Sequence, residues 1–128
     1  MNQFLSIKYD LEERTAIFSE RLIELCKKLP KSLISIPLID QLVRSGTSIG
    51  ANYREANGAS SRKDFGNKIY ICKKEAKETY YWLRLLSKSC DNDVMFTQCQ
   101  KLLKEAHELS LIFSKIASNT FKNSKLSH

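Results

Sequence analysis

Proline occurs only twice in this chain of 128 residues, at positions 30 and 37. Proline interrupts a helix because it lacks a backbone donor and clashes with the preceding turn. Residues 38–128 contain none, and the whole chain has only four glycines. This scarcity of breaks favours a few long helices over many short strands. A chain of this length also has room for one core, and therefore for one domain.

The apolar residues before Pro30 recur at three- and four-residue intervals, as in Leu22, Leu25 and Leu29. That period places them on one face of a helix, which Asp10 is expected to cap and Pro30 to stop. Periodic segments after Pro37 predict three more helices, separated by short polar turns. The predicted helices span residues 10–29, 37–57, 61–90 and 94–121. Residues 122–128 are expected to form a frayed basic tail.

Long helices joined by short connections predict an all-α fold, an antiparallel up-down-up-down four-helix bundle over residues 1–121. Gly46 and Gly50 lie one turn apart inside the second helix, where each costs about 0.5–1 kcal/mol relative to alanine. The pair predicts a neighbouring helix packed closely against that face. Gly58 is expected to end the second helix in a left-handed cap, and Ser61 to cap the third.

Cysteine and histidine give no sign of a metal site or a cofactor. The four cysteines form no C-x-x-C pair, and the two histidines are far apart. Cys26 and Cys72 fall on apolar helix faces, so reduced, structural thiols are expected. The longest uncharged stretch, residues 45–53, is too short to cross a membrane, and the N-terminus lacks the features of a signal peptide. These features predict a cytoplasmic protein.

Positive charge gathers on the third predicted helix. Residues 61–91 carry eight basic and four acidic groups, so they supply +4 of the net charge of +7. Several of the basic residues are eleven apart, which is almost three full helical turns. They should therefore form one stripe opposite the apolar face, with two tyrosine rings set into it. The stripe consists of Arg62, Lys63, Lys73, Lys74, Lys77, Arg84 and Lys88, with Tyr70 and Tyr81.

Three interpretations of the stripe remain open from these residues. Phosphates could meet the cations while exposed bases stack on tyrosine, which describes nucleic-acid binding without sequence preference. The face could instead contact another protein, or could simply be solvated, with Glu75 and Glu78 offsetting it. In that last interpretation Lys74 pairs with Glu78 at i,i+4.

No arrangement of residues indicates catalysis. The chain has no glycine-rich phosphate loop, no nucleophile elbow and no paired Glu-x-x-His motif of a two-metal bundle. We therefore expect no enzymatic activity.

Two segments resemble a known family, namely QLVRSGTSIGANYREANGASSRKDF at 41–65 and KKEAKETYYWLRLL at 73–86. They are similar to the core of the 23S rRNA-intervening sequence proteins, also called four-helix-bundle proteins. Polar as well as apolar positions match the family pattern. The matching residues are Arg44, Ser45, Ser48, Ile49, Asn52, Glu55, Ala56, Asp64, Phe65, Glu75, Glu78, Trp82 and Leu83.

The resemblance implies a bacterial, cytoplasmic four-helix bundle that forms a ring-shaped homopentamer. Family members are encoded within insertions in large-subunit ribosomal RNA genes, or elsewhere in the genome. A related branch, the accessory variability protein of diversity-generating retroelements, works beside a reverse transcriptase on RNA. The main family has no firmly assigned activity.

Together these features predict a non-catalytic, oligomeric protein that binds nucleic acid, with RNA favoured, through the basic stripe. Tyr80 and Trp82 lie at the margins of the apolar face and are expected at subunit contacts, where large rings are common. The alternative function is an assembly adaptor that docks a protein, such as a reverse transcriptase, without binding nucleic acid itself.

Overall fold

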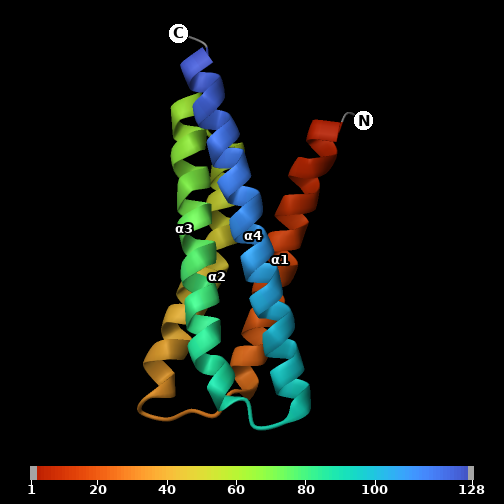
Figure 1. Cartoon of the computed structure of the whole chain (residues 1–128), viewed down its shortest axis with the longest axis vertical. Helices are drawn as coiled ribbons and strands as arrows, with labels where there is room; N and C mark the ends of the chain where they lie inside the picture. The colour runs from red at the N-terminus through yellow and green to blue at the C-terminus, as the bar shows by residue number, and fades with distance from the viewer. Residues whose placement is uncertain (1–2, 127–128) are drawn as a thin grey trace.

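A computed structural model describes the backbone of residues 3–126 and the side chains of residues 11–120. The fold is the predicted all-α, antiparallel four-helix bundle, and the described residues contain no strand (Figure 1). A short 3-10 turn, η1, follows the third helix. The elements are α1 (Gln3–Lys28), α2 (Ser35–Asn57), α3 (Arg62–Leu86), η1 (Ser87–Ser89) and α4 (Asp93–Leu126).

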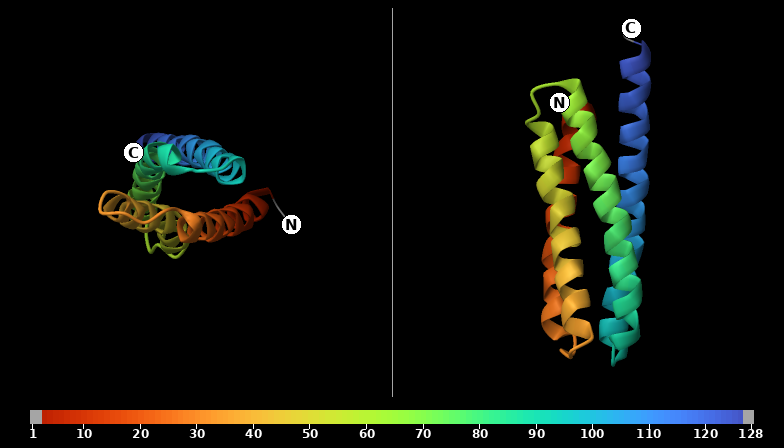
Figure 2. Two further views of the ribbon diagram at one scale, coloured as in Figure 1. Left: turned by 90° about the horizontal axis from the view of Figure 1, so that it is seen from below. Right: turned by 90° about the vertical axis from the view of Figure 1, so that its left-hand side faces the viewer.

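The four helices do not pack equally. The α1–α2 and α3–α4 connections lie at one end of the bundle, and the α2–α3 connection lies near the two termini (Figure 1). Helix α3 packs against both α2 and α4. Helix α1 contacts α2 more extensively than it contacts α4. Seen along the bundle, α1 and α4 diverge and leave one side open (Figure 2). The end of α4 extends beyond the other helices.

The first two helices begin earlier than their sequences predict. Helix α1 starts at Gln3, so Asp10 lies within it and is not its cap. No proline or glycine in residues 3–29 interrupts the helix there. Helix α2 begins at Ser35, where Ser32 and Ser35 exchange backbone-to-side-chain hydrogen bonds of 2.8 and 3.0 Å. Pro37 is accommodated because donors in the first turn need no helical partner.

The ends of the later helices also differ from the predictions. Gly58 follows α2, but its φ of −98° is not left-handed, and its N–H donates to the carbonyl of Glu55 at 3.1 Å. Helix α3 ends at Leu86 instead of residue 90, which places Lys88 in η1. The predicted frayed tail from residue 122 is helical backbone as far as Leu126, since no proline or glycine stops α4. Residues 127 and 128 lie outside the described part.

The core is built from side chains of all four helices. Phe18, Leu42, Leu83 and Phe113 come from α1 to α4 in that order, and each is almost fully buried. The ring of Phe113 also packs against the ring of Tyr53 on α2, with the two ring centroids 5.6 Å apart. Burying side chains of this size is worth about 1.5–3 kcal/mol each, which makes the shared core the main force holding the bundle together.

The predicted close approach at Gly46 and Gly50 is confirmed, and the approaching helix is α1. A Cβ atom at Gly46 would lie 2.5 Å from Cδ1 of the buried Leu22. A Cβ at Gly50 would lie 3.0 Å from the hydroxyl of Thr15. Ser19 adds a hydrogen bond of 3.3 Å to the Gly46 carbonyl. The two glycines therefore let α1 pack directly on the backbone of α2, which offsets their cost to helix stability.

All four cysteines are free thiols, as predicted. Burial raises the pKa of Cys26 to about 11 and the pKa values of Cys72 and Cys99 to about 12. Cys90 is half-buried, and burial raises its pKa too. Because the thiolate is the reactive form, the three buried thiols should be inert near neutral pH.

In the folded protein at about pH 8, we expect one thiol, Cys90, to react faster than the other three with a thiol-specific reagent, and all four to react after unfolding. Counting modified thiols by mass spectrometry against time checks this. The Cys90→Ser variant should lose the fast reaction. Rapid modification of two or more thiols in the folded protein would contradict the described packing.

Candidate nucleic-acid interface

Helix α3 starts with the predicted cap. The Ser61 hydroxyl accepts a hydrogen bond of 3.0 Å from the backbone N–H of Asp64, and Asp64 places negative charge in the first turn. Ile69, Cys72 and Leu83 bury the opposite face of the helix against the core. Because that face of α3 is buried, the basic residues on the other side of the helix point outward.

The basic residues of the stripe are accessible along the length of α3. Lys73 is half-buried, because it lies beside the core edge, and the other cations are exposed. From Arg62 to Arg84 the stripe covers about 33 Å of one straight helix at 1.5 Å per residue. Lys88 is exposed too, but it lies on η1 beyond the end of that helix. The structure thus brings six of the seven cations onto one helix and places the last just past it.

The carboxylates expected to offset the stripe are bound elsewhere. Arg44 on α2 donates to the buried Glu75 at 3.1 Å and also to Glu78. The predicted Lys74–Glu78 pair is therefore wrong, because the guanidinium reaches both acids across the helix interface. Burial lowers the pKa of Arg44, but its hydrogen bond to Glu78 and the charges of both acids outweigh burial and raise it.

A second ion pair binds another acidic side chain to a cation that is not part of the stripe. Lys68, which lies apart from the other cations of α3, donates to Glu55 at 2.6 Å. This hydrogen bond raises the pKa of Lys68. Among the described side chains, no carboxylate lies within ion-pair distance of any stripe cation. The positive charge of the stripe is consequently not neutralised within the described part of the chain.

The two tyrosines in the stripe are exposed, 60% for Tyr70 and 53% for Tyr81. The ammonium of Lys73 lies 6.0 Å from the centre of the Tyr70 ring, near the outer limit of a cation–π contact. Tyr81 instead lies edge-on to Trp82, with the ring centroids 5.1 Å apart. Both phenol rings therefore remain available to an external group.

Tyr80 and Trp82 lie on opposite sides of α3. Trp82 is half-buried against the core, and its indole N–H donates to Glu78 at 3.2 Å. Tyr80 is 38% exposed, and its ring centroid lies 6.1 Å from the ring centroid of His107 on α4. Each ring thus has a partner within the chain as well as an accessible edge. Their participation in subunit contacts stays a prediction.

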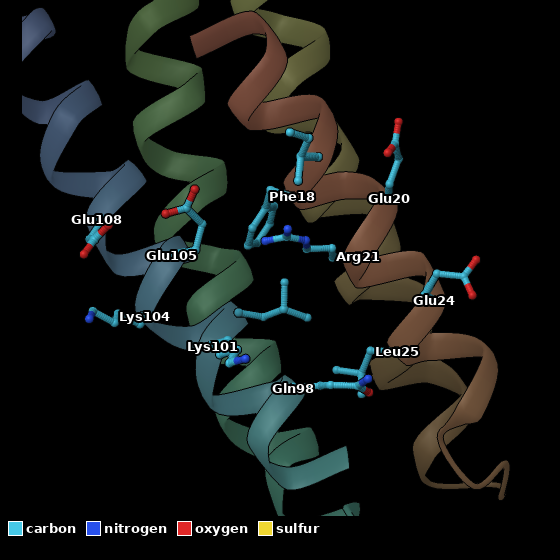
Figure 3. Close-up of a pocket in the computed structure, with 12 residues that line it drawn as sticks. Phe18, Glu20, Arg21, Glu24, Leu25, Gln98, Lys101, Lys104, Glu105 and Glu108 are labelled. Atoms are coloured by element: carbon cyan, nitrogen blue, oxygen red, sulfur yellow. The ribbon is translucent and has the colours of Figure 1, made fainter. Parts of the chain in front are cut away.

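One cavity, about 840 Å³, lies on the open side between α1 and α4 and does not include the stripe. Arg14 crosses this side nearby, donating to Glu105 at 2.6 and 2.7 Å and to Glu108 at 2.8 Å. Figure 3 shows Arg21 and Gln98 extending into the space between the helices. The lining carries four glutamates beside three basic residues, which does not favour a polyanion.

A second cavity, about 740 Å³, lies between the first half of α3 and the later turns of α4, and it includes the first part of the stripe. Periodicity along α3 could not reveal it, because α4 supplies one wall. Gly66 on α3 faces α4 here, and a Cβ there would lie 3.4 Å from the Thr120 methyl group, which is close to ordinary contact. The lining residues are Arg62, Lys63, Gly66, Asn67, Tyr70, Lys73, Ser114, Ala117, Ser118 and Thr120.

The described residues offer neither a metal site nor a membrane-spanning helix. No group of three or more histidine, cysteine or acidic side chains could hold a metal ion. None of the helices in this part of the chain is both long and apolar enough to span a membrane.

Comparison with known proteins agrees with the bundle. A crystal structure of a Bacteroides thetaiotaomicron protein with unknown function, from the S23 ribosomal protein family, is similar at 37% identity and a TM-score of 0.72. The match covers 83% of this chain and 96% of that one. No curated protein matches. The model of the 23S rRNA-intervening sequence protein family matches residues 8–115. This match spans most of the chain, and the protein therefore belongs to the 23S rRNA-intervening sequence protein family.

Proposed function

We propose that the protein is a non-catalytic nucleic-acid-binding bundle, with RNA as the favoured partner, and that the stripe on α3 is its binding face. The observation that carries the proposal is the set of accessible cations without carboxylate partners in the described part of the chain. A row of this kind matches the regular negative charge of a nucleic-acid backbone. Binding through phosphates alone is independent of sequence.

Ion pairing within the bundle supports the proposal. Arg44 and Lys68 pair with Glu75, Glu78 and Glu55, so two of these three negative charges are offset and repel a polyanion approaching α3 less. The net charge of +7 adds long-range attraction. The family's name refers to ribosomal RNA, which favours RNA over DNA.

We further propose that the protein works as a homopentamer in the bacterial cytoplasm. The family resemblance suggests the ring, and the accessible edges of Tyr80 and Trp82 offer apolar contact surface for it. Free cysteines suit a reducing compartment. Five copies of the stripe on one particle would raise the affinity for a long RNA above that of one bundle.

The alternative function, a protein adaptor, is favoured by a different surface. Apolar side chains are exposed at the end of the bundle that carries the α1–α2 and α3–α4 connections (Figure 1), including Leu33 at 95%, Ile34 at 78% and Val94 at 67%. An exposed apolar surface of this kind often marks a protein contact. A polymerase such as a reverse transcriptase could dock there without any use of the stripe.

One experiment separates the two functions. The purified protein is mixed with labelled RNA at about 50 mM salt and separated on a native gel, and bound proteins are recovered from lysate with and without nuclease. Our proposal predicts a shift of free RNA, and partners that disappear after nuclease treatment. No RNA shift together with a nuclease-resistant partner would favour the adaptor.

A further inference from the structure

The α3–α4 groove has the lining expected of a nucleotide site. Its volume of about 740 Å³ is within the usual range for small-ligand sites. Three of its lining residues, Arg62, Lys63 and Lys73, are cations of the stripe, and none of its lining residues is acidic. The lining of the cavity between α1 and α4 differs, because it carries both acidic and basic side chains. Of these two cavities, the α3–α4 groove is therefore the one lined by positive charge without acidic residues.

Tyr70 gives this groove an aromatic wall. The ring is 60% exposed, and the ammonium of Lys73 lies over it, 6.0 Å from its centre. The hydroxyls on the α4 wall are less available, since Ser114 and Thr120 donate to backbone carbonyls of their own helix at 2.7 and 2.9 Å. The groove thus offers cations and one flat ring, beside the polar side chains of Asn67 and Ser118.

These features favour single-stranded over double-stranded nucleic acid. Bases in a duplex stack on one another and hide their faces, whereas an unpaired base exposes both. A tyrosine ring stacks on any base, and nearby cations hold the flanking phosphates. A duplex could contact the cations along α3 but could not place a base on Tyr70.

We infer that the α3–α4 groove holds one unpaired nucleotide, with its base on Tyr70 and its flanking phosphates on Arg62, Lys63 and Lys73. The protein then prefers single-stranded over double-stranded RNA. This inference rests on the proposed function, because it names the form of nucleic acid that the stripe binds.

The test measures the fluorescence anisotropy of three labelled probes, a 12-nucleotide oligouridylate, the same backbone without bases, and a 12-base-pair RNA duplex. Wild-type protein should bind the oligouridylate most tightly. Tyr70→Leu should weaken that binding by about 5–150-fold, the usual range for one stacked base, and leave the other two affinities unchanged. Tyr81→Leu is the comparison variant and should lose less affinity for the oligouridylate, because Tyr81 is similarly exposed in the stripe but lies outside the groove.

The outcomes separate this inference from the proposed function. Failure of the wild-type protein to bind any probe at about 50 mM salt would overturn both. Binding of all three probes with no effect of Tyr70→Leu would overturn the groove assignment and leave the stripe in place. An equal loss in Tyr70→Leu and Tyr81→Leu would also overturn it, since stacking would then be spread along α3.

Discussion

Reversing the charges of Lys73, Lys74 and Lys77 to glutamate is expected to weaken RNA binding on the order of 100-fold at about 50 mM salt. Each substitution removes a phosphate contact and adds repulsion. A loss of about 1 kcal/mol at each site gives about 3 kcal/mol in total, which corresponds to that factor. The fold should survive, because none of the three lysines pairs with a described carboxylate. Anisotropy titration with a labelled RNA measures the loss, and thermal unfolding checks the fold.

A matched variant controls for net charge. Reversing Lys101, Lys104 and Lys115 on α4 gives the same change of −6, from +7 to +1, with three exposed residues that lie outside the stripe. This variant should lose much less affinity, because it affects only the long-range attraction. Equal losses in the two variants would show that total charge governs binding and not the face of α3. Full affinity in the α3 variant would exclude the stripe.

The largest effect on stability is expected at the contact between α1 and α2. Leu22→Ala should cost about 2–5 kcal/mol of unfolding free energy, because Leu22 is fully buried. Gly46→Ala alone should also destabilise, since the new methyl group would meet Leu22 at 2.5 Å. In the double variant the methyl group enters the space that Leu22 vacates. Urea unfolding should therefore reveal a favourable coupling of about 1–3 kcal/mol between the two substitutions.

Gly50→Ala provides the control for this cycle. Its new Cβ would meet Thr15 and not Leu22, so its effect should add to that of Leu22→Ala within about 0.5 kcal/mol. All variants are compared at one protein concentration, since association would make unfolding depend on concentration. Strict additivity of Gly46→Ala and Leu22→Ala would contradict the close approach of α1 to Gly46.

The sequence was most informative where one helix determines the outcome. Apolar periodicity found the four helices, because the core side of each follows directly from the spacing of its residues. Ser61 was identified as a cap because its partner, Asp64, is three residues away. Gly46 and Gly50 were informative because glycine destabilises a helix interior, so two of them indicate a close packing contact. The helix ends were less predictable, since α1 and α4 simply continue until something stops them.

Contacts between helices could not be predicted in the same way. The i,i+4 rule paired Lys74 with Glu78, but Arg44 on another helix takes Glu78 and Glu75 together. Nothing in the local spacing gives the rotation of α2 that brings Arg44 there. For the same reason the stripe could be predicted from α3 alone, whereas the groove at Tyr70 could not, because the second wall comes from α4.

The dependence of RNA affinity on salt tests the central claim most directly. If about five of the stripe cations contact phosphates, the logarithm of the binding constant should fall against the logarithm of the salt concentration with a slope near −3.5. Affinity should then drop by about 100-fold between 50 and 200 mM salt. Absence of binding at 50 mM, or an affinity that hardly changes across the series, would contradict a backbone-binding role for the cations of α3.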